Sequence, residues 1–479
     1  MTIFEKSEKG QRAWSLPKSD NAFESFQIEK TLARKSPLLL PEISEINLTR
    51  HFSLLAKKNM GIDTNFYPLG SCTMKLNPRI NEVAAALPGF TRTHPLAPDD
   101  TVQGNLELIW ELIALLADVG GFTAGTLLPN SGAQGEFCGI RMIQAYHESR
   151  NDPRNVILVP DNAHGTNPAT AAMAGYKIVS IKTNSQGDMN LEDLKAHLSP
   201  KTAGLMLTNP NTLGLFSPNI LDITRLVHEA GGLLYYDGAN LNPILYHVRP
   251  GDMGFDVCHY NLHKTFSTPH GGGGPGAGPV LCSDKLKPFL PTPRVEKHKD
   301  HFIRIEKSPL SIGQIATFNG NFAVCLRAYL YAILHGKFGL YRIGEIATLN
   351  ANYLKNGLSK YFTVPFPQAC CHEFVVQADR FLPNIRSNDI AKRLLDYGIH
   401  APTVYFPLII KECLLIEPTE SESKATLDRF LDVIHQIAEE CTSNPELVKT
   451  APHTTPIGRL DEVAANRKPI LKASTKSNG

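Results

Sequence analysis

The feature that most constrains the fold is an alternation of short apolar segments with helical patterns between residues 156 and 282. Apolar residues recur at helical spacing in 103–119, 190–198 and 219–230. Strands that alternate with helices favour a largely parallel sheet with helices on both faces, so we expect an α/β fold. The apolar segments predicted to be strands are 156–160, 176–181, 204–208, 232–237, 258–262 and 278–282.

The length of the chain predicts more than one part. With 479 residues, it is too long for one simple core. The pattern becomes helical from residue 312, a strand is expected at 372–378, and a helix at 421–442 closes this region. We therefore expect a large sheet domain and a smaller α/β C-terminal domain. The predicted parts are an N-terminal arm at 1–60, the large domain at 61–310, the small domain at 311–450 and a tail at 451–479.

Charge and cysteine usage exclude several classes of function. The 48 Lys and Arg residues against 46 Asp and Glu give a net charge of +2, which predicts no affinity for nucleic acid or for an acidic membrane. The nine cysteines form no CxxC pair, which argues against a zinc site or a disulfide framework and favours a reducing compartment. We find neither an apolar leader nor a run long enough to span a bilayer. We expect a cytoplasmic protein that binds no metal.

Lys264 and Asp237 together suggest a cofactor site. Lys264 follows a predicted strand and precedes a glycine-rich segment, and a lysine amine that loses its proton can attack an aldehyde. Asp237 ends another predicted strand, at the edge where open α/β sheets bind ligands. Pyridoxal 5'-phosphate needs such a lysine and a carboxylate against its ring nitrogen. Taken alone, Lys264 is more simply a surface lysine and Asp237 a turn residue.

The segment NSGAQGE at 130–136 could bind the phosphate of this cofactor. It lies before a predicted helix, whose first backbone N–H groups favour an anion. A plain helix cap explains the segment equally well. His263 could donate to the same phosphate, or it could be a core histidine. The candidate residues in this segment are Ser131, Gly132, Ala133 and Gln134.

His164 and Thr208 complete the candidate site. His164 follows the predicted strand at 156–160 and could stack on the cofactor ring, although a structural histidine is an even alternative. Thr208 ends the strand at 204–208, at the same edge as Asp237. The order along the chain is phosphate turn, stacking histidine, ring aspartate and lysine. This order resembles fold-type I enzymes of pyridoxal phosphate, the aspartate-aminotransferase-like class.

Longer blocks narrow the resemblance to the glycine cleavage system P-protein family. They include NFYPLGSCTMKLNP at 65–78, LPNSGAQGE at 128–136, AHGTNPA at 163–169 and NLHKTFSTPHGGGGPGAGP at 261–279. The chain is similar to the C-terminal half of that enzyme, which in split systems is subunit 2 and carries the cofactor lysine. The resemblance implies a fold-type I transferase with Lys264, Asp237 and His164 as catalytic residues and no metal.

The resemblance also implies the reaction and its partners. Glycine is decarboxylated, carbon dioxide is released, and the aminomethyl group passes to the lipoyl group of H-protein. The implied partners are subunit 1, lipoylated H-protein and the other glycine cleavage components, with a heterodimer or a dimer of heterodimers as the assembly. Ser71, Cys72 and Thr73 would grip the substrate carboxylate, although a tight structural loop fits them almost as well. The run Gly271 to Gly274 would let its loop pack closely or move.

Two alternatives stay open at this point. Another fold-type I activity, such as an aminotransferase or an amino-acid decarboxylase, would use an arginine for the substrate carboxylate, and Arg380 and Arg393 are available. A scaffold subunit without activity would lack the cofactor lysine, so Lys264 argues against it.

Overall fold

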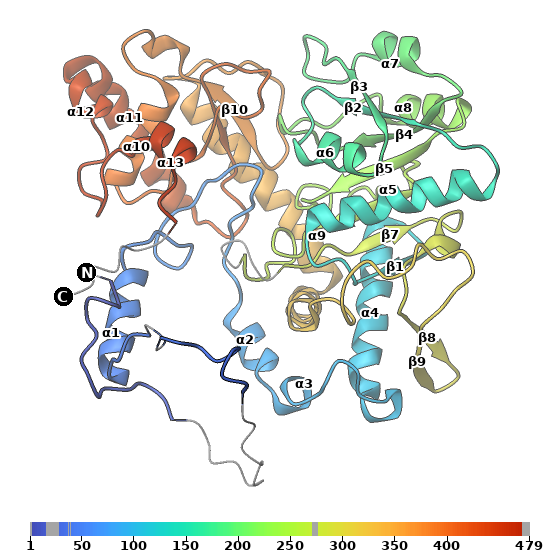
Figure 1. Ribbon diagram of the computed structural model, residues 1–479. Helices are drawn as coiled ribbons and strands as arrows, with labels where there is room; N and C mark the ends of the chain where they lie inside the picture. Colours follow the sequence, from blue (N-terminus) through green and yellow to red (C-terminus); the bar gives the residue numbers. More distant parts are fainter. Residues whose placement is uncertain (1, 16–27, 37, 39, 271–275, 472–479) are drawn as a thin grey trace. The chain divides into compact units, whose positions relative to one another are not determined.

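The computed structural model describes residues 2–15, 28–36, 38, 40–270 and 276–471, so the predicted glycine run at 271–274 lies outside the described residues. The chain forms two compact units (Figure 1). The smaller unit combines the chain up to Gly61 with the chain from Pro452 onwards, and the larger unit is Ile62–Ala451. The smaller unit contains the helices α1 (Glu45–Ala56) and α13 (Glu462–Arg467). The division of the chain into an arm, a large domain, a small domain and a tail remains a prediction.

The larger unit is built on a seven-stranded sheet with the order β1-β7-β6-β5-β4-β2-β3. Neighbours from β6 to β3 run parallel, whereas β7 is antiparallel to both β6 and β1. The predicted α/β class and the mostly parallel sheet are therefore confirmed. The strands are β1 (Ala124–Thr126), β2 (Val156–Pro160), β3 (Lys177–Ile181), β4 (Thr202–Leu207), β5 (Leu233–Gly238), β6 (Val257–Tyr260) and β7 (Val280–Cys282).

Helices cover both faces of this sheet because its strands are apolar on both sides. Alternate strand residues belong to two separate cores: Tyr236 lies in one and Tyr235 in the other. Parallel strands buried on both faces are expected to be apolar throughout. The first core includes α4 (Gln103–Gly120), α7 (Leu191–His197) and α8 (Ile220–Glu229), and the second includes α5 (Gly132–Ser149) and α6 (Thr166–Met173).

Two expected elements differ from the structure in length. The strand expected at 258–262 ends at Tyr260. There the chain turns, since the Lys264 backbone N–H donates to the Asn261 carbonyl at 3.0 Å. The helical region expected from residue 312 begins only at Phe322, as α9 (Phe322–Leu358). Gly336, with a φ of +59°, interrupts α9, because its left-handed backbone cannot continue a helix.

The C-terminal part carries its own small sheet and its own core. Its strands pair antiparallel in the order β10-β12-β11. The last half of α9 packs on this sheet together with the closing helices. These elements are β10 (Phe374–Gln377), β11 (Thr403–Val404), β12 (Cys413–Ile416), α10 (Ser387–Asp396), α11 (Lys424–Ser443) and α12 (Pro445–Lys449).

The segment from Ile62 to Lys75 belongs to the small sheet although it is far away in sequence. Phe66 is buried in the core of the C-terminal part and bridges to Ile399. The Gly70 N–H donates to the Leu415 carbonyl at 3.3 Å. Ser71 and Thr73 follow with φ of +67° and +49°, so this loop turns sharply at the edge of the sheet. The following residues lead through α2 (Arg79–Ala85) and α3 (Pro88–Thr91) to α4.

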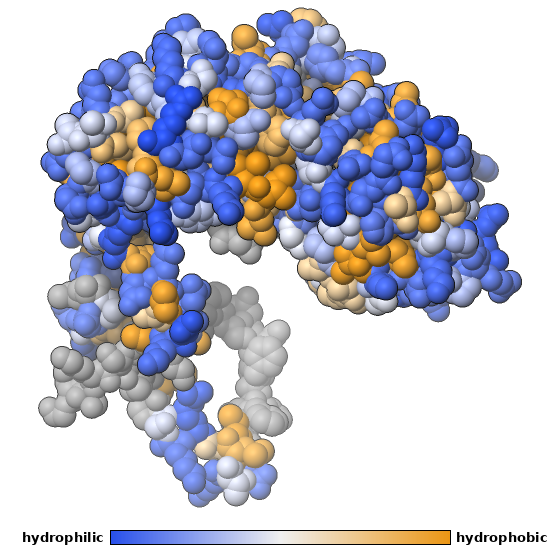
Figure 2. Space-filling view, turned by 90° about the horizontal axis from the view of Figure 1, so that it is seen from above, coloured by the Kyte–Doolittle hydropathy of each residue, from blue (hydrophilic) through white to orange (hydrophobic). Residues whose placement is uncertain are grey.

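The surface is mainly polar, with separate apolar patches (Figure 2). Large exposed apolar side chains of the larger unit include Ile80 and Val83 on α2, and Phe338 on α9. A hairpin of β8 (Arg294–His298) and β9 (His301–Ile305) also packs on α4. Among the described residues, no helix has both the length and the apolar character needed to cross a membrane.

Candidate active site

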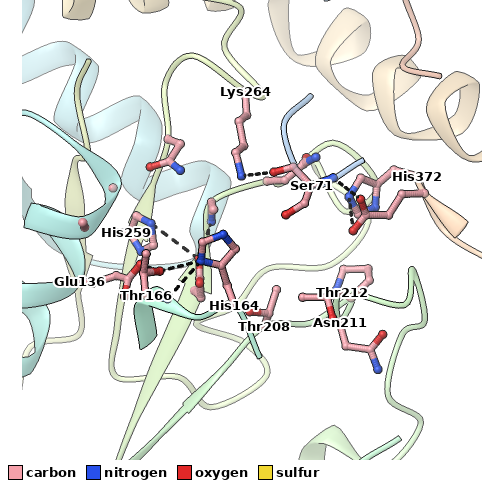
Figure 3. Close-up of a pocket in the computed structure, with 18 residues that line it drawn as sticks. Ser71, Glu136, His164, Thr166, Thr208, Asn211, Thr212, His259, Lys264 and His372 are labelled. Atoms are coloured by element: carbon pink, nitrogen blue, oxygen red, sulfur yellow. Dashed lines mark hydrogen bonds and ion pairs between the residues drawn. The ribbon is translucent and has the colours of Figure 1, made fainter. Parts of the chain in front are cut away.

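A pocket lies at the carboxyl ends of β4 and β5 and is closed by the loop at Ser71 (Figure 3). Open α/β sheets bind ligands at this edge. Seven of the residues predicted from the sequence line this pocket, and they come from six separate segments. They are Ser71, Gly132, Ala133, His164, Thr208, Asp237 and Lys264.

Lys264 projects into the pocket from the turn after β6. Its side chain amine donates a hydrogen bond to the Ser71 carbonyl at 2.6 Å, and the residue is half-buried. In Figure 3, Lys264 and His164 enter the pocket from opposite directions. The amine therefore stands where it could form a bond to a ligand that lies between the two side chains.

Asp237 lies near the carboxyl end of β5 and is 3% exposed. Burial alone would raise its pKa, but His259, the Asn167 amide and Lys264 outweigh burial and lower the pKa below its usual value. Asn167 donates to Asp237 Oδ2 at 2.8 Å, and His259 Nε2 lies 3.6 Å from Oδ1. Asp237 is thus a buried carboxylate that stays ionised, as a partner of a protonated ring nitrogen must.

Glu136, from the first turns of α5, stands beside this aspartate. The Asn167 amide donates to Glu136 Oε2 at 3.1 Å as well as to Asp237, so it joins the two carboxyl groups. Burial and the charge of Asp237 raise the pKa of Glu136 to about 7. Glu136 ends the segment NSGAQGE, and the sequence pattern predicted no role for it.

His164 presents a neutral ring to the pocket. Burial of the ring, more than any charge near it, lowers the pKa of His164, with Asp237 acting in the opposite direction. Its Nδ1 lies 2.9 Å from Thr166 Oγ1, and Thr166 in turn donates to Glu136 Oε1 at 2.6 Å. This contact fixes the ring at the start of α6, where it can stack on a flat ligand.

Small residues open the N-terminus of α5 to the pocket. Gly132 and Ala133 begin the helix, whose first backbone N–H groups have no intrahelical acceptor. Ser131 and Gln134 do not line the pocket. The Ser131 hydroxyl caps the helix by accepting from the Gln134 N–H at 3.2 Å. The Gln134 side chain bonds to the Asn130 N–H and to the Ile315 carbonyl.

The pocket has unmatched polar groups that fit a polar aromatic phosphate ester. Thr208 Oγ1, His259 Nε2 and Asn261 Oδ1 are buried, and the described residues offer them no hydrogen-bond partner. Such groups are costly unless a ligand or water pairs with them. A Cβ on Gly132 would lie 2.2 Å from Asn261 Oδ1, so the backbone here is open only because the residue is glycine. The residues present therefore fit pyridoxal phosphate.

Three further predicted residues do not line the pocket. His263 meets the ring of His270 at 4.7 Å, and burial with the charge of Lys264 lowers its pKa to about 3. Burial raises the pKa of Cys72, so its thiol stays protonated. The buried Thr73 hydroxyl donates to Glu417 Oε1 at 2.7 Å.

Several polar residues in or beside the pocket were not predicted from the sequence. His259 sits inside β6, and a histidine in an otherwise apolar strand was the available signal. His372 and Glu373 immediately precede β10, and Glu417 follows β12. Charged residues at the ends of buried strands were visible in the sequence, but only the fold brings these strand ends to the pocket.

The arginines considered for an aminotransferase lie elsewhere. Arg393 donates to Glu440 and Asp396 at 2.8 and 2.9 Å. Arg380 donates to the Lys360 carbonyl at 3.1 Å. Neither guanidinium lines the pocket, which removes the residue-level support for that alternative.

Comparisons with known proteins agree with this arrangement. Residues 138–295 match the family model described as aminotransferase class-V, and residues 343–453 match the model described as glycine dehydrogenase, C-terminal domain. A solved structure of glycine decarboxylase (P-protein) of the glycine cleavage system superposes with a TM-score of 0.73 at 19% identity, covering 85% of this chain and 93% of that one. A cysteine desulfurase from Thermococcus onnurineus gives 0.61 at 15% identity, over 78% and 95%. The class is thus an aminotransferase-like α/β fold.

Sequence relatives give the family. A probable glycine dehydrogenase (decarboxylating) subunit 2 from Caldanaerobacter subterraneus is 54% identical over 98% of this chain and 98% of its own length. A protein of the same description from Staphylococcus aureus is 52% identical over 98% and 97%. The chain belongs to the family of glycine dehydrogenase (decarboxylating) subunit 2.

Proposed function

We propose that this chain uses pyridoxal 5'-phosphate to decarboxylate glycine and passes the aminomethyl group to the lipoyl group of H-protein. The observation that carries the proposal is that Lys264, Asp237 and His164 line one pocket, together with the open N-terminus of α5. The family of the chain and its fold support the same conclusion. Bound pyridoxal phosphate supplies a ring that accepts the electron pair left when the carboxyl group departs.

Each candidate residue has a role that its environment allows. The Lys264 amine would hold the cofactor and exchange with the amine of glycine. Asp237, ionised and buried, would keep a proton on the ring nitrogen. The neutral ring of His164 would stack on the cofactor, while the first N–H groups of α5 and the Thr208 hydroxyl would bind its phosphate.

Two of the predicted phosphate ligands receive other roles. Ser131 caps α5, and Gln134 fixes the turn before it through Asn130 and Ile315. Both residues would shape the phosphate turn rather than reach the phosphate. Similarly, Thr73 would hold the substrate loop through Glu417, and Ser71 would meet the substrate directly.

We also propose a cytoplasmic assembly with subunit 1, which then receives lipoylated H-protein. The description of the relatives as subunit 2 supports a partner subunit. Exposed apolar side chains on α2, such as Val83 at 63% exposure, offer a surface of the kind that partners cover. All nine cysteines are free, which fits a reducing compartment.

Replacing the lysine tests the proposal. In Lys264→Ala, we expect the absorbance band of the bound cofactor to be lost and exchange of carbon dioxide with the glycine carboxyl to fall to background. Exchange is measured with labelled bicarbonate, with and without H-protein and subunit 1. The wild-type chain should need subunit 1 for full activity.

Retained exchange in Lys264→Ala would contradict the proposal. Amino transfer from glycine to a keto acid without H-protein would instead favour an aminotransferase. Lys285→Ala is a suitable control, because this half-exposed lysine pairs with Asp256 and does not line the pocket. Its exchange should equal that of the wild type.

A further inference from the structure

Two buried carboxyl groups of the C-terminal part lie beside the pocket, and neither has a role in binding the substrate in the function proposed above. Glu373 precedes β10 and is 4% exposed, and Glu417 follows β12 and is 0% exposed. Since β10 and β12 are antiparallel, with Phe374 opposite Ile416, both glutamates come to the same end of the small sheet. Glu373 lines the pocket itself.

A single residue connects Glu373 with the cofactor lysine. The Ser71 N–H donates to Glu373 Oε2 at 2.7 Å, and the Ser71 carbonyl accepts from the Lys264 amine at 2.6 Å. The other oxygen of Glu373, Oε1, lies 3.7 Å from His372 Nε2, beyond hydrogen-bond distance. A substrate whose amine lies at Lys264 would therefore be close to the Glu373 carboxyl, because only Ser71 separates the two side chains.

The hydrogen bonds indicate which of the two glutamates carries a proton. Glu417 accepts from the Thr73 N–H at 3.1 Å, from the Thr73 hydroxyl at 2.7 Å and from the Asn240 amide at 2.9 Å. These donors lower the pKa of Glu417, although burial still raises it to about 7, so Glu417 loses its proton before Glu373 does. Among the described residues, Glu373 accepts a hydrogen bond only from Ser71, and burial together with the charge of Glu417 raises its pKa to about 8.

The remaining titratable groups around Glu373 do not reverse this preference. Within the part of the chain that the structure describes, the charge of Lys264 lowers the pKa of Glu373, but by less than burial raises it. Burial lowers the pKa of His372 to about 3, so its ring is neutral. The thiols of Cys72, Cys370 and Cys371 all have raised pKa values and are neutral as well.

The pocket offers a substrate carboxylate little positive charge. Among the described residues that line it, none is an arginine, and Lys264 is reserved for the cofactor. The lining histidines His164, His259 and His372 all have lowered pKa values. A carboxylate in this pocket must therefore be bound by neutral hydrogen-bond donors.

We propose that the carboxyl group of Glu373 donates a hydrogen bond to the carboxylate of the amino-acid substrate. This inference rests on the function proposed above and specifies how glycine is held. A neutral donor orients the carboxylate without the strong ion pair that an arginine would form. Such an ion pair would stabilise a negative charge that disappears when carbon dioxide leaves, and so would raise the barrier.

The pH dependence of glycine binding tests the proposal. The chain is loaded with pyridoxal phosphate, assembled with subunit 1 and titrated with glycine at pH 7 and pH 9, with the cofactor absorbance as the readout. With a pKa of about 8, the fraction of protonated Glu373 falls about tenfold between these values. Glu373→Gln keeps an acceptor for Ser71 and a neutral donor at both pH values. The ratio of the wild-type to the Glu373→Gln dissociation constant should therefore rise about tenfold from pH 7 to pH 9.

Comparing the two proteins at each pH cancels the pH dependence that they share, including the titration of the glycine amine. Methylamine lacks a carboxylate. For this ligand, the ratio of the wild-type to the Glu373→Gln dissociation constant should be the same at both pH values. Glu417→Gln removes the neighbouring charge that helps to raise the Glu373 pKa. In this variant, glycine binding should therefore begin to weaken at a lower pH than in the wild type. Glu412→Gln is the matched control, because Glu412 also accepts from a serine N–H, that of Ser387 at 3.0 Å, but does not line the pocket.

Different results separate this inference from the proposed function. If the wild type shows no glycine-dependent absorbance change at either pH, the function itself is wrong. If the wild type binds glycine but the ratio to Glu373→Gln stays constant, only the role of Glu373 is overturned. A ratio that rises equally for methylamine would also overturn it, because the effect would then not involve the carboxylate.

Discussion

Asp237 and Glu136 are neighbouring carboxyl groups whose pKa values move in opposite directions. Both are buried and both accept from Asn167, yet the pKa of Asp237 is lowered, because His259, the Asn167 amide and Lys264 outweigh its burial. Burial and the charge of Asp237 raise the pKa of Glu136. Their surroundings therefore give one ionised group and one group that holds a proton near neutral pH.

The variant Asp237→Asn tests this assignment. The amide is close in shape to the carboxylate but could not hold a proton on the ring nitrogen, so we expect glycine–carbon dioxide exchange to fall about 100-fold to 1,000-fold, the usual cost of losing one preorganised electrostatic group. The cofactor should still bind, because Lys264 and the α5 N-terminus are unchanged. Exchange within about threefold of the wild type, well short of that usual cost, would exclude the proposed role.

Among single residues, those that follow strands of the large sheet were predicted from the sequence. Asp237, His164 and Thr208 could be found because the carboxyl ends of parallel strands share one edge. Glu373 could not be found in the same way. Glu373 meets Ser71 at the pocket because the segment at Gly70 pairs with Leu415. Both contacts join residues more than three hundred positions apart in sequence.

Among the secondary-structure elements, the N-terminus of α5 is packed closely enough to require glycine at position 132. A Cβ at Gly132 would meet the Asn261 side chain, and Gly278 packs in the same way against the Ser131 backbone. The turn that leads to Lys264 and the turn that begins α5 are thus in direct contact. This packing explains why small residues occur in both segments.

We expect Gly132→Ala to weaken binding of pyridoxal phosphate at least tenfold, about 1.4 kcal/mol, because the added Cβ would displace Asn261, which also lines the pocket. Binding is measured by absorbance titration of the apo chain, with circular dichroism to follow the fold. Gly104→Ala, in the first turn of α4, is the control, since its Cβ would meet nothing within 4 Å. Equal affinity for Gly132→Ala and Gly104→Ala would show that the close approach has no bearing on the cofactor.

The lengths of the elements were predicted less well than their order. The strand before Lys264 is short because the Lys264 N–H closes a turn with Asn261. Residues 312–321 contain apolar side chains at helical spacing but form no helix; Gly313 and Gly320 in this stretch have φ of +82° and +74°. The local hydrophobic pattern thus predicted whether a segment is a helix or a strand, but not where that segment begins and ends.

For the whole molecule, the buried glutamates make stability depend on pH. Their folded pKa values, about 8 for Glu373 and about 7 for Glu417, lie above those of an unfolded chain, near 4.5. Between these values, the unfolded chain releases protons first as the pH rises, so the free energy of unfolding falls. Above about pH 8 this contribution is constant. Below about pH 6.5, the neutral buried His263 and His372 act in the opposite direction.

Glu373→Gln should therefore gain stability relative to the wild type as the pH rises from 5 to 8.5, by up to about 4 kcal/mol. Thermal unfolding of the apo chain at several pH values measures this as a growing difference in midpoint. Glu412→Gln should show no such trend. A difference that stays flat between pH 5 and pH 8.5 would mean that Glu373 ionises in the folded chain as it does in the unfolded one.

The pairing of the segment at 62–75 with the small sheet has a consequence for protein engineering. Exchanging the C-terminal part for that of a relative would also exchange Leu415, Glu373 and Glu417 and leave the native segment against foreign neighbours. A working chimera has to transplant both stretches of chain together, since the loop that contacts Lys264 is held in place by the part that lies furthest from it in sequence.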